Sequence, residues 1–120
     1  MAKNNTRFIC TIMILALIII VGGVSPARSV DFKDYEKIKD SKEFKLYIKG
    51  VGEGISWANT ALEARGSKLL FCQPNKLALG SKNYLDILRR EIGENADVYK
   101  IDTPVEAILL RGIINTFPCK

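Results

Sequence analysis

The residues of this sequence with the most distinctive chemistry are its cysteines. Three are present, and Cys72 and Cys119 follow the N-terminal apolar segment. Cys119 comes directly after Pro118, one residue from the end of the chain, where a free thiol would be exposed and reactive. An even, minimal cysteine count in an exported chain is typical of one disulfide. We therefore predict a Cys72–Cys119 bridge, with two unpaired buried thiols as the alternative.

The other residue types give little basis for catalysis or metal binding. The sequence has no histidine, the commonest general base and metal ligand. Two cysteines without histidine fall short of the four ligands of a structural zinc site. The 13 acidic residues show no spacing that marks a catalytic pair. We predict no catalytic residue, no metal and no cofactor, and hence a binding protein or inhibitor and not an enzyme.

The first 29 residues have the pattern of a signal peptide. Lys3 and Arg7 precede an apolar run, and Ala27 and Ser29 are small residues of the type that signal peptidases recognise. We predict cleavage after Ser29, with Ala27 as second choice and a retained anchor as the alternative. Cys10 would be removed with this segment, leaving a domain of residues 30–120 with no membrane contact.

The charge of the remaining domain is close to balanced. Three of the 18 basic residues lie in the predicted signal peptide, which contains no acidic residue. The exported domain therefore has a small net positive charge and no nucleic-acid-binding motif, so we expect no nucleic-acid partner.

A long amphipathic helix is predicted from Asp40 to about Arg65. Asp40 followed by Glu43 resembles a capping pair, and Gly66 is a suitable stop. Apolar residues recur every three or four positions: Phe44, Tyr47, Ile48, Val51, Ile55, Ala58 and Leu62. Gly50 and Gly54 share a face, which predicts that another element packs close there or that the helix bends. Trp57 is expected in the core or at its edge.

Two further helices are predicted before the C-terminus. One begins near Ser81 or Asn83 and ends at about Ile92, before Gly93, with Glu91 in solvent. The other begins with Thr103 as N-cap and Pro104 at the first position, and ends at Phe117 because of Pro118. No sustained strand-type alternation is present. The predicted fold is all-α, a compact bundle of three to five helices closed by one disulfide.

Three short motifs, read together, resemble the Rap/Tai family of type VI secretion immunity proteins. The first is a glycine-rich helix ending in a small residue and asparagine, "GVGEGISWAN". The second is the turn "FCQP", and the third is the closing "FPC". They occur in order between about Phe44 and Cys119. The resemblance implies a helical, disulfide-bonded periplasmic protein, often a homodimer, that binds and occludes peptidoglycan-cleaving amidase effectors.

If the resemblance holds, a loop or a helix edge would plug the effector's active-site cleft. The polar loops Glu94–Lys100 and Gln73–Leu79 are the best candidates, and they contain the four residues for which we predict partner binding: Tyr99, Asp97, Asn95 and Lys76. Tyr99 is the favoured anchor, because tyrosine provides a large contact area at low entropic cost; local packing is the competing interpretation. A small periplasmic chaperone, or another helical binding protein, is the alternative function.

Overall fold

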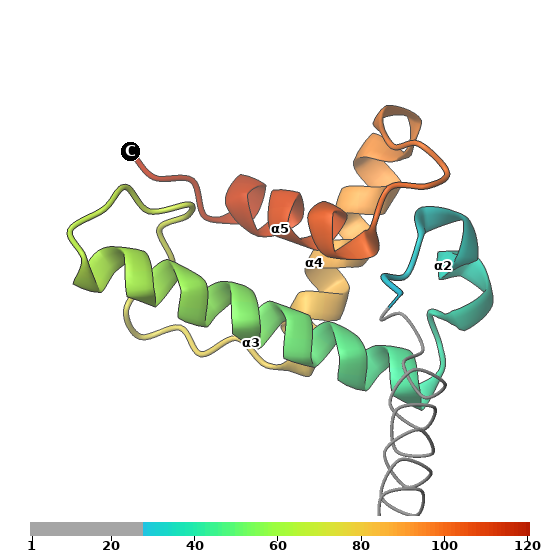
Figure 1. Ribbon diagram of the computed structural model, residues 1–120, viewed down its shortest axis with the longest axis horizontal. Helices are drawn as coiled ribbons and strands as arrows, with labels where there is room; N and C mark the ends of the chain where they lie inside the picture. The colour runs from blue at the N-terminus through green and yellow to red at the C-terminus, as the bar shows by residue number, and fades with distance from the viewer. Residues whose placement is uncertain (1–27) are drawn as a thin grey trace, which may run out of the picture.

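The computed structural model describes residues 28–120, so nearly all of the predicted signal peptide, with Cys10, lies outside the described residues. Within 28–120 the protein is all-helical, without a β-strand, as predicted. Its elements are α2 (Phe32–Ile38), α3 (Lys42–Ala64), α4 (Ser81–Asn95), the 3₁₀ helix η1 (Ala96–Val98) and α5 (Val105–Thr116). Figure 1 shows α5 lying over the long α3, with α4 crossing behind α5 and meeting α3 at its lower end.

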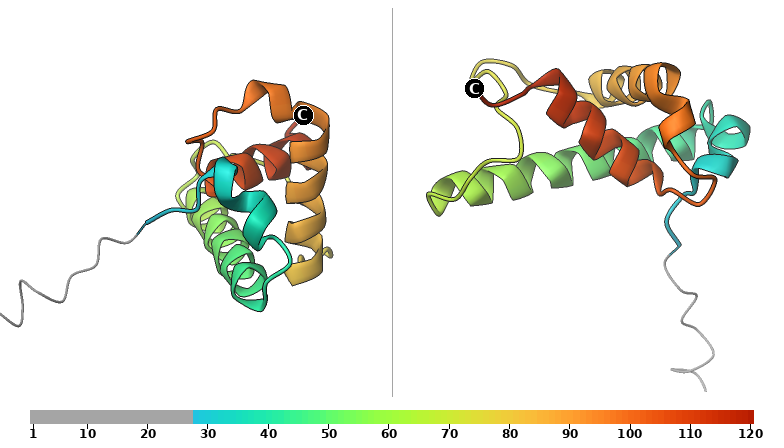
Figure 2. Two further views of the ribbon diagram at one scale, coloured as in Figure 1. Left: turned by 90° about the vertical axis from the view of Figure 1, so that its right-hand side faces the viewer. Right: turned by 90° about the horizontal axis from the view of Figure 1, so that it is seen from above.

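The core lies where α3, α4 and α5 meet. Ile48 of α3, Leu88 of α4 and Ile108 of α5 are completely buried. The contact between α4 and α5 is the most extensive of the bundle, and the views in Figure 2 show these two helices packed side by side. Aromatic rings extend the core toward both ends of the bundle: Tyr35, Phe44, Phe71 and Tyr84.

The long helix α3 begins one residue later than its capping pattern predicts. Ser41, not Asp40, is the N-cap, and its Oγ accepts a hydrogen bond from the Phe44 backbone N–H at 3.1 Å. Asp40 and Ser41 are both good N-cap types, and the turn that ends α2 decides which of them occupies the position. Beyond the end of α3, Gly66 has a φ of +63°, a conformation that glycine adopts without steric cost.

The glycines of α3 do not have the roles predicted from their spacing. A Cβ atom on Gly50 or Gly54 would meet nothing within 4 Å, whereas one on Gly52 would lie 2.5 Å from the Tyr84 ring. Gly52 is therefore the position where α4 approaches the α3 backbone. The prediction for Trp57 is also wrong, since its side chain is 74% exposed. The close approach within the described chain thus lies at Gly52 and not at the predicted Gly50 and Gly54, because glycines occur on both faces of α3 and their spacing does not show which face packs.

The other two long helices also differ from prediction at their ends. Helix α4 continues through Gly93 to Asn95. Helix α5 has Pro104 as its N-cap, so Thr103 lies outside it, and Thr103 Oγ1 instead accepts a hydrogen bond from the Lys100 N–H at 3.0 Å. The longer α4 and the later start of α5 leave residues 96–104 as the connection between the two helices, and this connection includes η1.

Val30 and the first two residues of α2 hold this connection in place. The Phe32 N–H donates to the Thr103 carbonyl at 2.8 Å, and the Lys33 N–H donates to the Ile101 carbonyl at 3.0 Å. In the opposite direction, the Val105 N–H donates to the Val30 carbonyl at 2.9 Å. The start of the described chain is thus fastened along residues 101–105, at the end of α5 remote from the C-terminus (Figure 1).

The predicted Cys72–Cys119 disulfide is present, with a sequence separation of 47. A loop of this length gives about 4 kcal/mol of stabilisation in the chain-entropy model. The Cys72 N–H also donates to the Phe117 carbonyl at 2.8 Å. On the other side, the Asn59 side chain of α3 donates to the Phe71 carbonyl at 2.9 Å and accepts from the Leu70 N–H at 2.8 Å. The loop after α3 is therefore fixed to both α3 and the end of α5.

Candidate functional site

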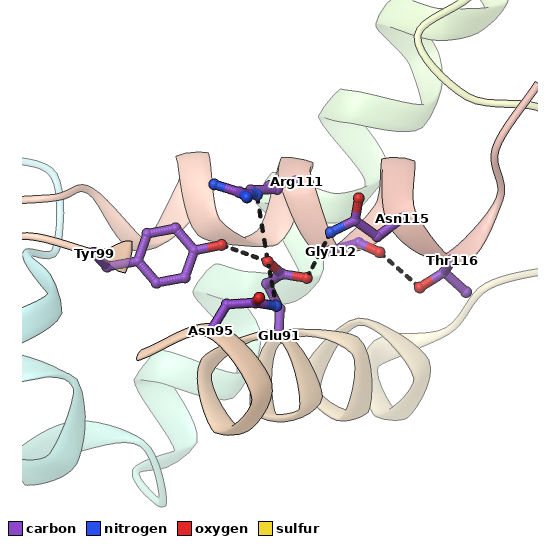
Figure 3. Close-up of polar contacts among 7 residues, drawn as sticks. All are labelled: Glu91, Asn95, Tyr99, Arg111, Gly112, Asn115 and Thr116. Carbon is purple, nitrogen blue, oxygen red and sulfur yellow. Dashed lines mark hydrogen bonds and ion pairs between the residues drawn. The ribbon is translucent and has the colours of Figure 1, made fainter. Parts of the chain in front are cut away.

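A buried carboxylate lies at the centre of the contact between α4, η1 and α5. Glu91 is only 4% exposed, contrary to the prediction that it faces solvent. Its Oε1 accepts hydrogen bonds from the Tyr99 hydroxyl and from Asn95 Nδ2, and its Oε2 accepts one from Asn115 Nδ2 at 3.0 Å. Arg111 Nε lies 3.6 Å from Oε1. Figure 3 shows the four partners converging on this carboxylate, which satisfies the rule that a buried charge must be hydrogen-bonded and paired.

A glycine on α5 allows the carboxylate to sit this deep. A Cβ atom on Gly112 would lie 2.9 Å from Ile87 Cγ2 and 3.1 Å from Glu91 Cβ. The backbones of α4 and α5 can therefore approach closely at this level. One turn further along α5, Thr116 Oγ1 donates to the Gly112 carbonyl at 2.6 Å and accepts from Arg90 at the same distance.

Tyr99 is held by this network on every side. Its ring meets the Phe32 ring edge-on at 6.2 Å, and the Arg111 guanidinium lies 5.7 Å from the ring centroid. Burial, and then the hydrogen bond to Glu91, raise the pKa of Tyr99 to about 12. The hydroxyl is thus kept protonated as a donor to the carboxylate. These contacts are those of a packing residue, the competing interpretation given for Tyr99.

The structure brings only part of the predicted partner-binding set together. Asn95 and Tyr99 share Glu91 as acceptor, and Asp97 is exposed between them on η1. Lys76 is exposed on the loop that carries Cys72. That loop is tied to the C-terminal end of α5, whereas η1 leads to its N-terminal end, and a 12-residue helix is about 18 Å long. Lys76 therefore belongs to a different part of the surface.

Two exposed apolar side chains accompany Asp97 on the segment between α4 and α5. Val98 is 53% exposed and Ile101 is 73% exposed. The segment forms a turn that projects from the bundle beyond the end of α4 (Figure 1). The sequence contains a signal for these residues, since Val98 and Ile101 are large aliphatic residues in an otherwise polar stretch. We name residues 97–101 the projecting turn.

The projecting turn has a fixed base and a free outer surface. Tyr99 points inward to Glu91, while the residues on either side of it are exposed. Phe32 and Lys33 bond the backbone at positions 103 and 101. A turn held in this way loses little conformational entropy when a partner binds it.

A second concave region lies beside the disulfide. It is a partly open cavity of about 470 Å³ between α3 and the loop that carries Cys72. Its wall includes Ser56 and Tyr84, whose hydroxyls are 3.0 Å apart, and Asn59, which is already bonded to the loop. The Ser56–Tyr84 pair joins α3 to α4, and Asn59 holds the loop against α3. Glu63 adds an exposed carboxylate at the rim.

The described residues contain neither a cluster of metal-ligating side chains nor a helix suited to crossing a membrane. Between residues 28 and 120, no three side chains of the metal-ligating types His, Cys, Asp and Glu form a cluster that could hold an ion. In the same range, none of the helices has the length and apolar character needed to cross a bilayer.

Comparison with known proteins gives no assignment. No family model, no curated protein and no solved structure matches this chain. The functional conclusion below therefore depends on the sequence motifs and on the geometry of the site.

Proposed function

We propose that this protein is a periplasmic immunity protein that binds a peptidoglycan-cleaving amidase effector of a type VI secretion system. It would block the effector's active-site cleft by contact alone, with no catalytic step of its own and without a cofactor. The proposal starts from the resemblance of the three motifs to the Rap/Tai family. It places the contact at the projecting turn.

The observation that carries the proposal is the difference in exposure between neighbouring residues of the projecting turn. Val98 and Ile101 are exposed apolar side chains, and the tyrosine between them is bonded to the buried Glu91. Apolar residues on a rigid support can be buried by a partner with little loss of conformational entropy, which leaves more of the contact energy as affinity. In this proposal Tyr99 is the support of the turn, and Val98 and Ile101 replace it as the anchors.

The positions of the three motifs in the fold support the scaffold part of the proposal. Asn59 from the first motif bonds the backbone of Phe71 in the second, and Cys72 bonds Phe117 and Cys119 of the third. Motifs that are far apart in the sequence thus meet at one place and close the bundle together. The disulfide is consistent with an oxidising compartment such as the periplasm.

The test is binding to purified type VI amidase effectors, measured by calorimetry and by inhibition of peptidoglycan cleavage. Val98→Glu combined with Ile101→Glu should weaken binding at least a hundredfold, because two charges would enter an apolar contact. Leu70→Glu is the matched control, since Leu70 is 43% exposed and lies outside both loops for which partner binding is predicted.

Three results would count against the proposal. One is that no amidase effector binds. Another is that the double variant binds as well as the unmodified protein. The third is that the protein protects unrelated unfolded proteins from aggregation and binds no effector, which would favour the alternative of a small periplasmic chaperone.

A further inference from the structure

The cavity beside the disulfide has the size of a small-molecule site. Its volume of about 470 Å³ lies within the range typical of ligand pockets. One wall is α3, and the other is the loop that carries Cys72, which turns back after α3 and runs along this helix to the start of α4 (Figure 1). The buried Phe71 and the half-buried Leu69 and Leu79 form an apolar part of the wall.

The loop wall of this cavity is fixed before any ligand binds. The disulfide at Cys72 attaches the loop to the end of α5, and Asn59 of α3 makes two hydrogen bonds to the loop backbone. Further along, the loop closes on itself, because the Leu77 N–H donates to the Pro74 carbonyl at 2.9 Å. A ligand would therefore enter a cavity whose walls already exist, at a low cost in conformational entropy.

Most hydrogen-bond donors in the cavity wall are used within the protein. The Asn59 amide donates to the loop backbone at 2.9 Å, and the Gln73 amide donates to a carbonyl of its own loop. The Thr60 hydroxyl donates to a backbone carbonyl of α3 at 3.1 Å. The donors left over are the Asn75 amide and one hydroxyl hydrogen of the pair that Tyr84 forms with α3. The wall therefore has few donors to offer a ligand.

Acceptors and one negative charge remain in the same wall. The side-chain oxygens of Thr60 and Gln73 accept no hydrogen bond within residues 28–120. The Glu63 carboxylate is exposed at the rim, and no lysine or arginine of the described chain forms an ion pair with it. No basic side chain of residues 28–120 lines the cavity either. The cavity is therefore suited to a ligand that donates hydrogen bonds and carries a positive charge.

We propose that this cavity binds a primary ammonium group carried on a short aliphatic chain. The three N–H donors of an ammonium match the free acceptor oxygens, and its charge would form a charge-assisted hydrogen bond with Glu63. The aliphatic chain would pack on the apolar part of the wall, as the stem of a lysine does on apolar surfaces. A lysine side chain of a partner protein and a small diamine share this chemistry. The proposal does not depend on the projecting turn or on any effector.

A matched pair of small probes tests the role of the ammonium group. The amides of N-acetyl-lysine and N-acetyl-norleucine have side chains of similar length, and a methyl group replaces the ammonium in the second. We expect saturable binding of the lysine compound in an NMR titration, with backbone shifts confined to the cavity wall, and at least tenfold weaker binding of the norleucine compound. No binding, equal binding of the two compounds, or shifts spread over the exposed carboxylates of the whole surface would overturn the proposal.

Variants of the protein test the assigned acceptors. Glu63→Gln should weaken binding of the lysine compound at least tenfold, because the charge is lost. Glu53→Gln is the matched control, since Glu53 is also exposed on α3 but lies outside the cavity and beside Lys49. Thr60→Val should have a smaller effect of about threefold, because it removes one neutral acceptor. Equal affinities of the Glu63 and Glu53 variants would contradict the proposal.

Two further measurements identify the source of the ammonium and separate this site from the projecting turn. Tighter binding of cadaverine than of the lysine compound would assign the site to a small diamine, and the reverse order would assign it to a lysine of a partner protein. The double variant Val98→Glu and Ile101→Glu should bind the lysine compound as the unmodified protein does, so a failure of effector binding remains distinguishable. Loss of binding in this double variant would contradict the assignment to the cavity.

Discussion

The two sides of α3 use the same residue type in opposite surroundings. On the inner side, Gly52 is in contact with Tyr84, and a methyl group there would overlap the ring. On the outer side, Gly50 and Gly54 face open space within the described chain. Glycine in a helix costs about 1 kcal/mol relative to alanine. The inner glycine offsets this cost through packing inside the chain, whereas no contact within residues 28–120 offsets it for the outer pair.

The largest effect should come from Gly52→Ala. The added Cβ would lie 2.5 Å from the Tyr84 ring, so α3 and α4 would have to separate. We expect a loss of about 3 kcal/mol in the free energy of unfolding, the upper range for overpacking a core. Urea denaturation at low protein concentration measures it. A loss below about 0.5 kcal/mol would show that the inner contact is not tight.

The second effect concerns the buried carboxylate between α4 and α5. Glu91→Ala would leave Asn115, Asn95 and Tyr99 without their shared acceptor. Because three part-buried hydrogen bonds to one carboxylate would be lost together, we expect a loss of about 2 kcal/mol. Glu94→Ala, one turn away and exposed, is the matched control and should change the free energy of unfolding by less than about 0.5 kcal/mol. Similar losses for the two variants would contradict the assigned role of Glu91.

A smaller and pH-dependent effect should follow from Tyr99→Phe. Removing the hydroxyl deletes one hydrogen bond to a carboxylate, at a cost of about 1.5 kcal/mol near neutral pH. The pKa of Tyr99 is raised to about 12, above the ordinary value of about 10 for an unfolded chain. The folded state therefore favours the protonated form, and this contribution is complete below pH 10 and is lost as the pH rises from 10 to 12.

Unfolding curves recorded at several pH values check this prediction. The difference in stability between the unmodified protein and Tyr99→Phe should shrink above pH 10. The comparison isolates Tyr99 from Tyr35, whose pKa is also raised by burial, because Tyr35 is present in both proteins. A difference that stays constant across this pH range would mean that Tyr99 ionises normally.

The smallest effects should come from the outer side. Gly54→Ala should raise the free energy of unfolding of the monomer by about 0.5–1 kcal/mol, because it gains helix propensity without a clash. Its sign is opposite to that of Gly52→Ala, two residues away. Thermal unfolding followed by circular dichroism is the appropriate measurement. A destabilised Gly54→Ala monomer would remove the distinction between the two faces.

The sequence predicts the helices and the disulfide better than the surroundings of single residues. The long helix was predicted because apolar residues recur at helical spacing on its inner side. The disulfide followed from the cysteine count and the predicted export. Two N-caps were each predicted one residue too early, because Ser41 and not Asp40 caps α3, and Pro104 and not Thr103 caps α5. Asp40 and Ser41 are both competent caps, and only the neighbouring turn chooses between them. Glu91 and Trp57 were assigned to the wrong environments, because burial depends on contacts with residues distant in the sequence.

By itself, the sequence determined the helical class, the single covalent closure and the regions where helices begin and end, because these depend on local spacing and on residue types. Tertiary structure alone decided which glycine is a contact, which carboxylate is buried and which tyrosine supports a turn. The physical reason is that Tyr84, Asn115 and Arg111 reach their partners from other helices. Only the packed chain brings Glu91 and Tyr99 together and leaves Val98, Ile101 and Trp57 in solvent.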